Sequence, residues 1–89
     1  MRQDHASNTV RKHLGERVRD LREAQDLSQY TFCRMIAMDR SYLIGVEKGR
    51  RNISIDNLYK IARGLGVPLS TLFEGVDEFH YEHVSLPEE

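Results

Sequence analysis

The stretch "SQYTFCRMIAMDRSYLIGVEKG", Ser28 to Gly49, has the form of two short helices joined by a tight break. Ser28 is a strong N-cap and predicts a helix at about 29–36. Asp39 caps a second helix at about 40–48, and Gly49 ends it as the left-handed residue that follows many helices. A connection of about three residues between two helices is the spacing of a helix-turn-helix, whose second helix enters the DNA major groove.

The second helix of this unit has two chemically different faces. Leu43 and Val46, three positions apart, form an inward apolar stripe, whereas Arg40, Ser41 and Ile44 lie on the opposite side. An arginine in the first turn can bind O6 and N7 of guanine together, which is worth about 1–3 kcal/mol of discrimination. A serine can bond either a base edge or a phosphate. The outward face therefore has the chemistry that base reading needs.

Groups suited to the DNA backbone flank this face. Gln29 opens the helix at 29–36, where its amide and the helix N-terminus can meet a phosphate oxygen. The loop "KGRRN" supplies Lys48, Arg50, Arg51 and Asn52 within five residues. Each phosphate that such a loop neutralises steepens the log–log salt dependence of binding by about 0.9. A basic loop alone is usually just solvated, so the indication for DNA comes from the loop, Gln29 and the helix face together.

A longer helix precedes the unit. Thr9 can cap it, and Asp26 tolerates the left-handed conformation expected at its end, near 25–26. Its apolar residues have the spacing of a single helix stripe: Val10, Leu14, Val18 and Leu21.

Two helices follow the unit. Ser54 caps a helix at about 55–63, which Gly64 or Gly66 ends, and a short helix is expected at 68–74. The strand-like alternation in the sequence is limited to four residues, "NISI". The predicted fold is therefore all-α, a five-helix bundle containing a helix-turn-helix.

The charge of the chain is unevenly distributed along its length. Residues 1–64 carry thirteen basic and eight acidic residues, a balance of +5, whereas residues 65–89 carry six acidic residues and no Lys or Arg. A basic body with an acidic end suits a nucleic-acid partner better than the net charge of −1 indicates. We expect one DNA-binding domain at 9–75, with the helix-turn-helix at 28–48, and an acidic tail at 76–89 that is either disordered or contacts a partner.

Other classes of function have little support. The single cysteine, Cys33, excludes an intramolecular disulfide and is expected in the core. His80 and His83 could share a helix face, but the sequence shows no recognisable set of four metal ligands, so we expect no metal and no cofactor. Catalytic motifs, a signal peptide and a membrane span are not recognisable in the sequence. We therefore expect a cytoplasmic, nucleoid-associated protein that is not an enzyme and has no membrane partner.

Residues 10–73 include "LSQ", "RSYL", "EKGRRN" and "GLGVPLSTLF", and with these motifs the chain resembles the Cro/phage-repressor type of helix-turn-helix regulator, the XRE family. The segment "DRSYLIGVEKGRRN" is most similar to the controller proteins of restriction–modification systems. The resemblance implies a lambda-repressor-like domain that binds double-stranded DNA. It also implies a homodimer on a palindromic operator whose half-sites lie about one helical turn apart.

The resemblance also assigns roles to single residues. Arg40 and Ser41 take base-reading positions, and Arg22 and Glu47 take positions that form an ion pair in some members of the family. The DNA backbone is assigned, by the resemblance or by the chemistry of the loop, to Gln29, Tyr42, Lys48, Arg50, Arg51 and Asn52.

Three positions depart from the pattern of the family. Ala37 stands where the turn often has glycine or asparagine, and left-handed alanine costs about 1 kcal/mol, so a differently shaped turn is expected. Gly45 occupies a position where some relatives place a third base reader. Ile44 is assigned to base reading, but it offers only an apolar contact, such as to a thymine methyl group.

The end of the predicted domain carries more apolar residues than one short helix can bury in so small a domain. This excess motivates a dimer interface formed by Leu65, Val67, Leu69, Leu72 and Phe73.

Two alternatives to a dimeric regulator stay open. In "FEGVDEFHYEHVSLPEE" apolar residues alternate with acids, so the tail could fold on a basic partner protein, as in a DNA-binding antitoxin. The second alternative is a helical bundle that has lost DNA binding. The operator sequence and the choice between activation and repression are not encoded in any recognisable pattern.

Overall fold

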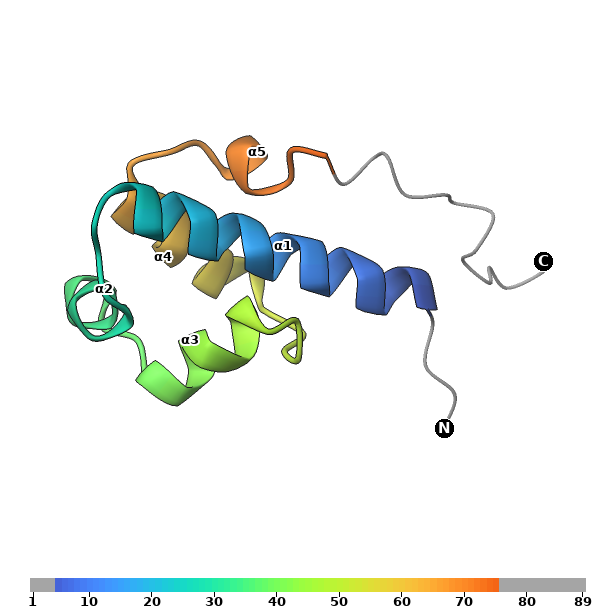
Figure 1. Cartoon of the computed structure of the whole chain (residues 1–89), viewed down its shortest axis with the longest axis horizontal. Coiled ribbons are helices and arrows are strands. Elements are labelled where there is room, and N and C mark those ends of the chain that lie inside the picture. The colour runs from blue at the N-terminus through green and yellow to red at the C-terminus, as the bar shows by residue number, and fades with distance from the viewer. Residues whose placement is uncertain (1–4, 76–89) are drawn as a thin grey trace.

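The computed structural model describes residues 5–75, and their regular structure is entirely helical, as predicted. Along the chain the helices are α1 (His5–Ala24), α2 (Gln29–Ile36), α3 (Arg40–Glu47), α4 (Ile55–Leu65) and α5 (Leu69–Leu72) (Figure 1). The acidic tail expected at 76–89 lies outside the described residues.

Three side-chain caps set the starts of α2, α3 and α4. Ser28, Asp39 and Ser54 each accept a hydrogen bond from the backbone N–H three positions further along, at 3.0, 3.3 and 3.1 Å. These caps confirm the predicted starts of all three helices, and α2 has the bounds that the sequence predicted. α3 ends one residue before the predicted position, with Lys48 as its C-cap and Gly49 left-handed behind it.

Helix α1 starts earlier than predicted. Thr9 was expected to cap it, but the helix already begins at His5 and Thr9 lies inside it. The segment "HASN" contains no glycine or proline that would end the helix there, so the helical pattern continues toward the N-terminus.

The ends of α4 and α5 also differ from the prediction. α4 continues to Leu65 because Gly64 stays helical and Gly66, with φ 73°, is the left-handed cap. α5 is shorter than the expected 68–74, since Pro68 is its N-cap and Phe73 its C-cap.

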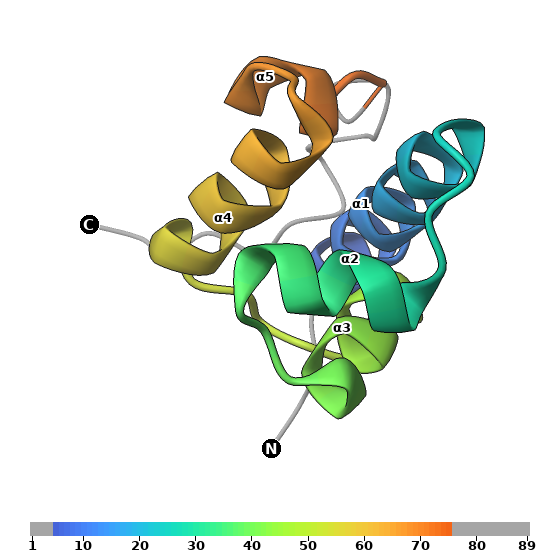
Figure 2. The same cartoon turned by 90° about the vertical axis from the view of Figure 1, so that its left-hand side faces the viewer.

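The helices enclose a single core. In both views α3 lies below α1 and α5 lies above it, so the two short helices are on opposite sides of the longest one (Figures 1 and 2). The buried apolar side chains come from all five helices: Leu14, Val18, Phe32, Cys33, Ile36, Leu43, Val46, Leu58, Ile61, Ala62, Leu65 and Leu72. The inward stripe predicted for the second helix of the helix-turn-helix, Leu43 and Val46, is thus confirmed.

Gly15 lets α1 approach the end of α3 closely. A Cβ at Gly15 would lie 2.3 Å from the carbonyl oxygen of Val46 and 2.6 Å from that of Glu47. Both separations are far below van der Waals contact, so α1 could not pack at this distance with any other residue. The position of α3 against α1 therefore depends on this glycine.

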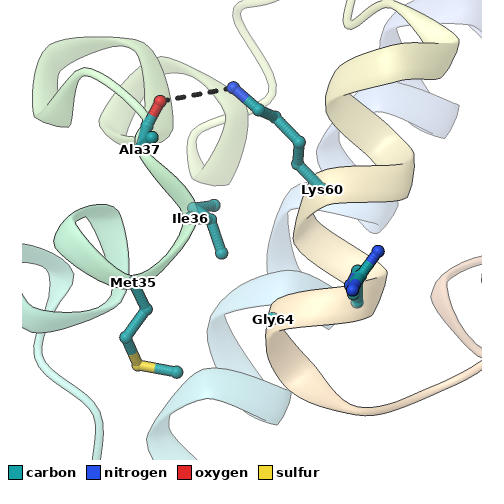
Figure 3. A pocket seen from close by; sticks show the side chains of 6 residues that line it. Met35, Ile36, Ala37, Lys60 and Gly64 are labelled. Carbon is teal, nitrogen blue, oxygen red and sulfur yellow. Dashed lines mark hydrogen bonds between the residues drawn. The ribbon is translucent and has the colours of Figure 1, made fainter.

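The turn between α2 and α3 keeps its left-handed residue. Ala37 has φ 55° and ψ 50°, so the expectation of a differently shaped turn is wrong. Its carbonyl oxygen accepts a hydrogen bond of 3.3 Å from Nζ of Lys60 on α4, across a pocket that Met35 and Ile36 also line (Figure 3). The surrounding structure holds alanine in this conformation despite a cost of about 1 kcal/mol.

Candidate nucleic-acid interface

The outward face of α3 carries the side chains predicted to read bases. Arg40 and Ser41 are exposed and Ile44 is half-buried, while Leu43 on the opposite face is completely buried. Oγ of Ser41 donates a short hydrogen bond to Oδ2 of Asp39, the N-cap of α3. The Ser41 hydroxyl proton is thereby committed to Asp39, so the serine can act toward DNA mainly as an acceptor.

The same contact acts on the acidity of the cap. The hydrogen bond from Ser41, followed by that from the backbone N–H of Tyr42, lowers the pKa of the Asp39 carboxyl below its ordinary value. Asp39 therefore stays ionised at the N-terminus of α3, where a negative charge favours the helix.

A buried ion pair ties α1 to the end of α3. Nε of Arg22 donates to Oε2 of Glu47 at 2.8 Å, and its Nη2 donates to Oε1 at 3.0 Å. The two residues are only 5% and 8% exposed, respectively. The bond to Glu47 is the main cause that raises the pKa of the Arg22 guanidinium above its ordinary value. The ion pair that the resemblance implies for Arg22 and Glu47 thus lies in the protein interior and is bidentate.

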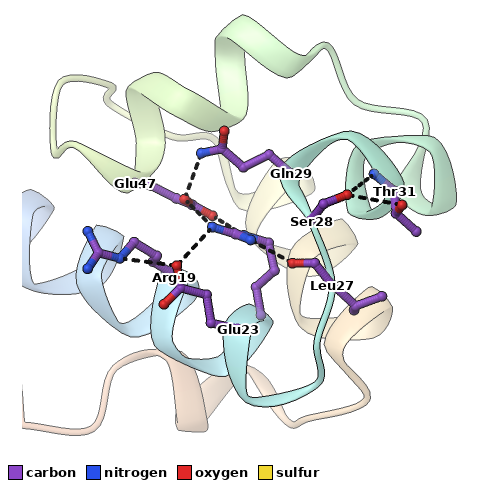
Figure 4. Close-up of polar contacts among 8 residues, drawn as sticks. Arg19, Glu23, Leu27, Ser28, Gln29, Thr31 and Glu47 are labelled. Carbon is purple, nitrogen blue, oxygen red and sulfur yellow. Dashed lines mark hydrogen bonds and ion pairs between the residues drawn. The ribbon is translucent and has the colours of Figure 1, made fainter.

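The ion pair is the centre of a larger polar network (Figure 4). Nη1 of Arg22 donates to the carbonyl oxygen of Leu27 at 2.6 Å, just before α2. Nε2 of Gln29 donates to Oε1 of Glu47 at 3.0 Å. Glu47 therefore fixes the amide of the residue that opens α2, and the network joins the end of α1, the start of α2 and the end of α3.

The side chain of Gln29 is held by this network, whereas its contact with DNA stays a prediction. Its amide nitrogen donates one hydrogen bond to Glu47, so the predicted contact with a phosphate falls to the second N–H of the amide and to the first-turn N–H groups of α2. The direction of the side chain is set inside the protein.

The basic loop after α3 is exposed to solvent. The side chains of Lys48, Arg50, Arg51 and Asn52 are all exposed, as a contact with phosphates would require. Arg51 differs from the others, because its Cζ lies 4.9 Å from the centroid of the half-buried Tyr42 ring. No pattern in the sequence indicates this contact, since the two residues are nine positions apart and lie on a helix and a loop.

The predicted dimer residues divide into two groups. Leu65 and Leu72 are 4% and 0% exposed and belong to the core of the domain, so their assignment to an interface was wrong. Leu65 continues the buried stripe of α4 with Leu58 and Ile61. Val67 is half-buried, and Leu69 and Phe73 are each 36% exposed, so these three retain apolar surface.

Sequence reasoning missed two exposed apolar residues on α4. Ile55 and Tyr59 are 71% and 54% exposed. They are four positions apart and therefore share a helix face next to the buried stripe. The spacing of four is visible in the sequence, where Ile55 also marks the start of the helix.

Contacts from α1 also hold the C-terminal end of α5. Arg17 donates two hydrogen bonds to the carbonyl oxygen of Thr71, at 2.6 and 3.2 Å, and forms an ion pair of 3.2 Å with Glu74. The ring of His13, for which the sequence suggested no role, is hydrogen-bonded to the carbonyl oxygen of Glu74 at 2.9 Å.

Metal and redox sites find no support in the part of the chain that the structure describes. Within it, no three His, Cys, Asp or Glu residues come together as a metal site would need. His80 and His83 lie outside the described residues. Cys33 is buried, and this burial raises the pKa of its thiol, as expected of an inert core residue. Among the described helices, none combines the length and the apolar character of a membrane span.

Comparisons with known proteins agree with this geometry. Residues 18–72 match the model of a helix-turn-helix family, HTH_3. The control protein C.MunI of a Mycoplasma species is 42% identical over 72 residues, which cover 80% of this chain and 97% of that protein. The crystal structure of the restriction–modification controller protein C.AhdI from Aeromonas hydrophila has a TM-score of 0.68 at 44% identity and covers 70% of this chain and 94% of that one. The controller protein C.Esp1396I, a tetramer in complex with its natural 35 base-pair operator, has a TM-score of 0.68 at 25% identity, covering 78% and 91%.

Proposed function

The chain belongs to the helix-turn-helix family HTH_3, of the XRE type, and from this membership we propose that it is a transcription regulator that binds a specific DNA sequence. One observation carries the proposal for this chain. The exposed Arg40 and Ser41 open a capped helix, α3, whose other face is buried, and an exposed basic loop follows directly. This arrangement combines base-reading groups with backbone-binding groups on one side of the molecule.

In the proposed complex α3 lies in the major groove. Arg40 reads a guanine through O6 and N7, and Ser41 and Ile44 contact neighbouring base edges. The backbone contacts come from the start of α2 and from the loop after α3, with Gln29, Tyr42, Lys48, Arg50, Arg51 and Asn52. The Arg22–Glu47 pair contributes by holding together the end of α1, the start of α2 and the end of α3.

We propose that the active form is a homodimer on a palindromic operator. The exposed apolar surface of Leu69 and Phe73, together with Ile55 and Tyr59, is available to a second copy. Half-sites one helical turn apart require that the two-fold dimer hold its two α3 helices about 34–36 Å apart. C.Esp1396I assembles on its operator as a tetramer, which supports an oligomeric DNA-bound form for this chain as well.

The similarity to control proteins C.MunI and C.AhdI favours a role in controlling restriction–modification genes. A regulator of this kind needs no catalytic chemistry, and we infer that the protein is not an enzyme and acts in the cytoplasm at the nucleoid. An additional partner protein bound through residues 76–89 is the alternative role, and those residues lie outside the described part of the chain.

Selection of random double-stranded DNA with the purified full chain tests the proposal. We expect an enriched motif with two-fold symmetry and half-sites about one helical turn apart. Arg40→Ala should weaken binding to this motif roughly 5- to 150-fold, because a bidentate guanine contact is worth about 1–3 kcal/mol. Arg63→Ala, which removes an exposed arginine of α4, is the matched control and should leave affinity nearly unchanged. Enrichment of no motif, or equal losses for the two variants, would contradict the proposal.

A further inference from the structure

Gly45 leaves room for the side chain of Arg51 on the outward face of α3. Gly45 is four positions after Ser41, so the two residues share that face. A Cβ on Gly45 would lie 2.9 Å from Cγ and 3.1 Å from Nε of Arg51. Nonbonded carbon atoms prefer separations of about 3.5–4.0 Å. The side chain of Arg51 therefore occupies the space that a side chain at position 45 would need.

The guanidinium of Arg51 ends beside the first turn of α3. Its distance of 4.9 Å from the Tyr42 ring centroid is within the roughly 6 Å range of a cation–π contact. Tyr42 belongs to the first turn, whereas Arg51 belongs to the loop beyond the other end of the helix. The side chain thus runs from the loop back along α3, across Gly45.

The electrostatics of the helix start agree with this path. The pKa of Asp39 is lowered first by the hydrogen bond from Ser41 and also by the positive charge of Arg51. The charge of Arg51 is therefore felt at the N-cap of α3, in the turn that carries Arg40 and Ser41.

We propose that Arg51 is a fourth base-reading side chain, beside Arg40, Ser41 and Ile44, and that Gly45 and Tyr42 are the residues that position it. This inference rests on the DNA-binding function proposed above, and for Arg51 it replaces the backbone contact included in that proposal. A planar guanidinium can donate to O6 and N7 of guanine together. Contact with the Tyr42 ring limits the freedom of this flexible side chain before DNA arrives, which reduces the entropy lost on binding.

The proposal gives Gly45 a defined task. Glycine is a poor helix residue, so its presence in the middle of an eight-residue helix weakens α3. Some relatives carry a base reader at this position, as the family resemblance indicates. In this chain Arg51 reaches the same part of the helix face from the loop, and a side chain at position 45 would displace it.

The positioning step can be tested without DNA. Stacking on Tyr42 should shift the NMR signals of the Arg51 side-chain methylene protons upfield by the ring current. Gly45→Ala and Tyr42→Leu should both remove this shift, while Gly45→Ala remains folded and at least as stable, because alanine favours the helix. An unchanged Arg51 signal in folded Gly45→Ala would overturn the positioning role.

A double-mutant cycle on the selected operator tests the consequence for binding. Gly45→Ala should weaken binding roughly fivefold or more in the wild-type background, near the lower limit for loss of a base contact. In the Arg51→Ala background the same substitution should change affinity little, because its target is already gone. Equal losses in both backgrounds would mean that the added methyl group itself obstructs the DNA, and would overturn the inference.

Random-DNA selection separates base reading from phosphate binding. We expect Arg51→Ala to lose the preference at one position of each half-site. Arg50→Ala, the adjacent exposed arginine, is the matched control and should keep the motif with a salt slope smaller by about 0.9. A uniform loss of affinity with an intact motif for Arg51→Ala would overturn base reading. If the wild-type protein selects no motif, the proposed function fails, whereas the ring-current shift still reports separately on the contact between Gly45 and Arg51.

Discussion

Removal of the charge at Glu47 should affect both the stability of the protein and its binding to DNA. Glu47→Gln keeps the shape of the side chain but leaves the buried guanidinium of Arg22 with only the exposed carboxylate of Glu23, at 3.8 Å, as a counter-charge. Arg22 is 5% exposed and bonds Glu47 at 2.8 and 3.0 Å, so neither solvent nor poor geometry weakens the pair. Loss of one partner from a buried pair costs about 3–5 kcal/mol, and we expect the lower value because glutamine retains one acceptor oxygen.

This loss is large on the scale of a small domain. A domain of this size unfolds with a free energy of roughly 5–15 kcal/mol, and each kcal/mol changes the melting temperature by about 4–8 °C. Calorimetry of Glu47→Gln should therefore show a melting temperature lower by about 12 °C or more. A change equivalent to less than about 0.5 kcal/mol, as for ordinary surface substitutions, would refute the view that the pair holds the helices together.

An apolar replacement of the whole pair separates stability from function. Arg22→Met with Glu47→Leu leaves no unpaired charge, and such replacements are often neutral or stabilising, so most of the lost stability should return. Operator affinity should remain low, because Gln29 has lost the acceptor that fixes its amide. Gln29→Ala should lower affinity to a similar degree at wild-type stability. If the apolar pair restores full operator affinity, the network does not position Gln29 for DNA.

Other predictions follow from single contacts. Ala37→Gly should raise the unfolding free energy by up to about 1 kcal/mol in chemical denaturation, because Ala37 is left-handed with φ 55°. The pKa of Asp39 is lowered in the folded protein, so ionised Asp39 stabilises the fold. This stabilisation is complete above the ordinary pKa of an aspartate and is lost as the pH falls through the lowered pKa. Asp39→Asn, which keeps an N-cap, should therefore make the free energy of unfolding less dependent on pH in this acid range. Leu69→Glu with Phe73→Glu should give a folded monomer in sedimentation at micromolar concentrations where the wild type is a dimer, and a wild type that sediments as a monomer would contradict the dimer.

Local sequence signals predicted much of the fold. Ser28, Asp39 and Ser54 cap helices by hydrogen bonds to residues three positions away. Both partners of each bond therefore lie within one short segment of the sequence, which makes these caps predictable. Helix ends were harder, because Gly64 and Gly66 are both possible terminators. The choice of Gly66 depends on the packing of Gly64, where a Cβ would lie 2.3 Å from Cγ2 of Ile36 on α2.

The composition of the candidate site was predictable, but its internal contacts were not. The outward direction of Arg40 and Ser41 follows from helix periodicity alone. The stacking of Arg51 on Tyr42 and the bond from Gln29 to Glu47 join residues on different elements, and their geometry depends on how the elements pack. The error at Leu65 and Leu72 has a similar origin, since periodicity identifies an apolar stripe but does not say whether the stripe faces the core or a second copy.

The position of α3 depends on contacts that lie far from its outward face. An eight-residue helix with a central glycine would not be stable alone in water, so the position of α3 must come from its neighbours. Two of these contacts come from α1, through the close approach at Gly15 and the ion pair of Arg22 with Glu47. Both act near the C-terminal end of α3, whereas Arg40 and Ser41 lie at its N-terminal end. A small rotation of α3 about the contacts at its C-terminal end would therefore displace most the groups proposed to read bases, so substitutions in α1 that touch no DNA should change operator affinity along with stability.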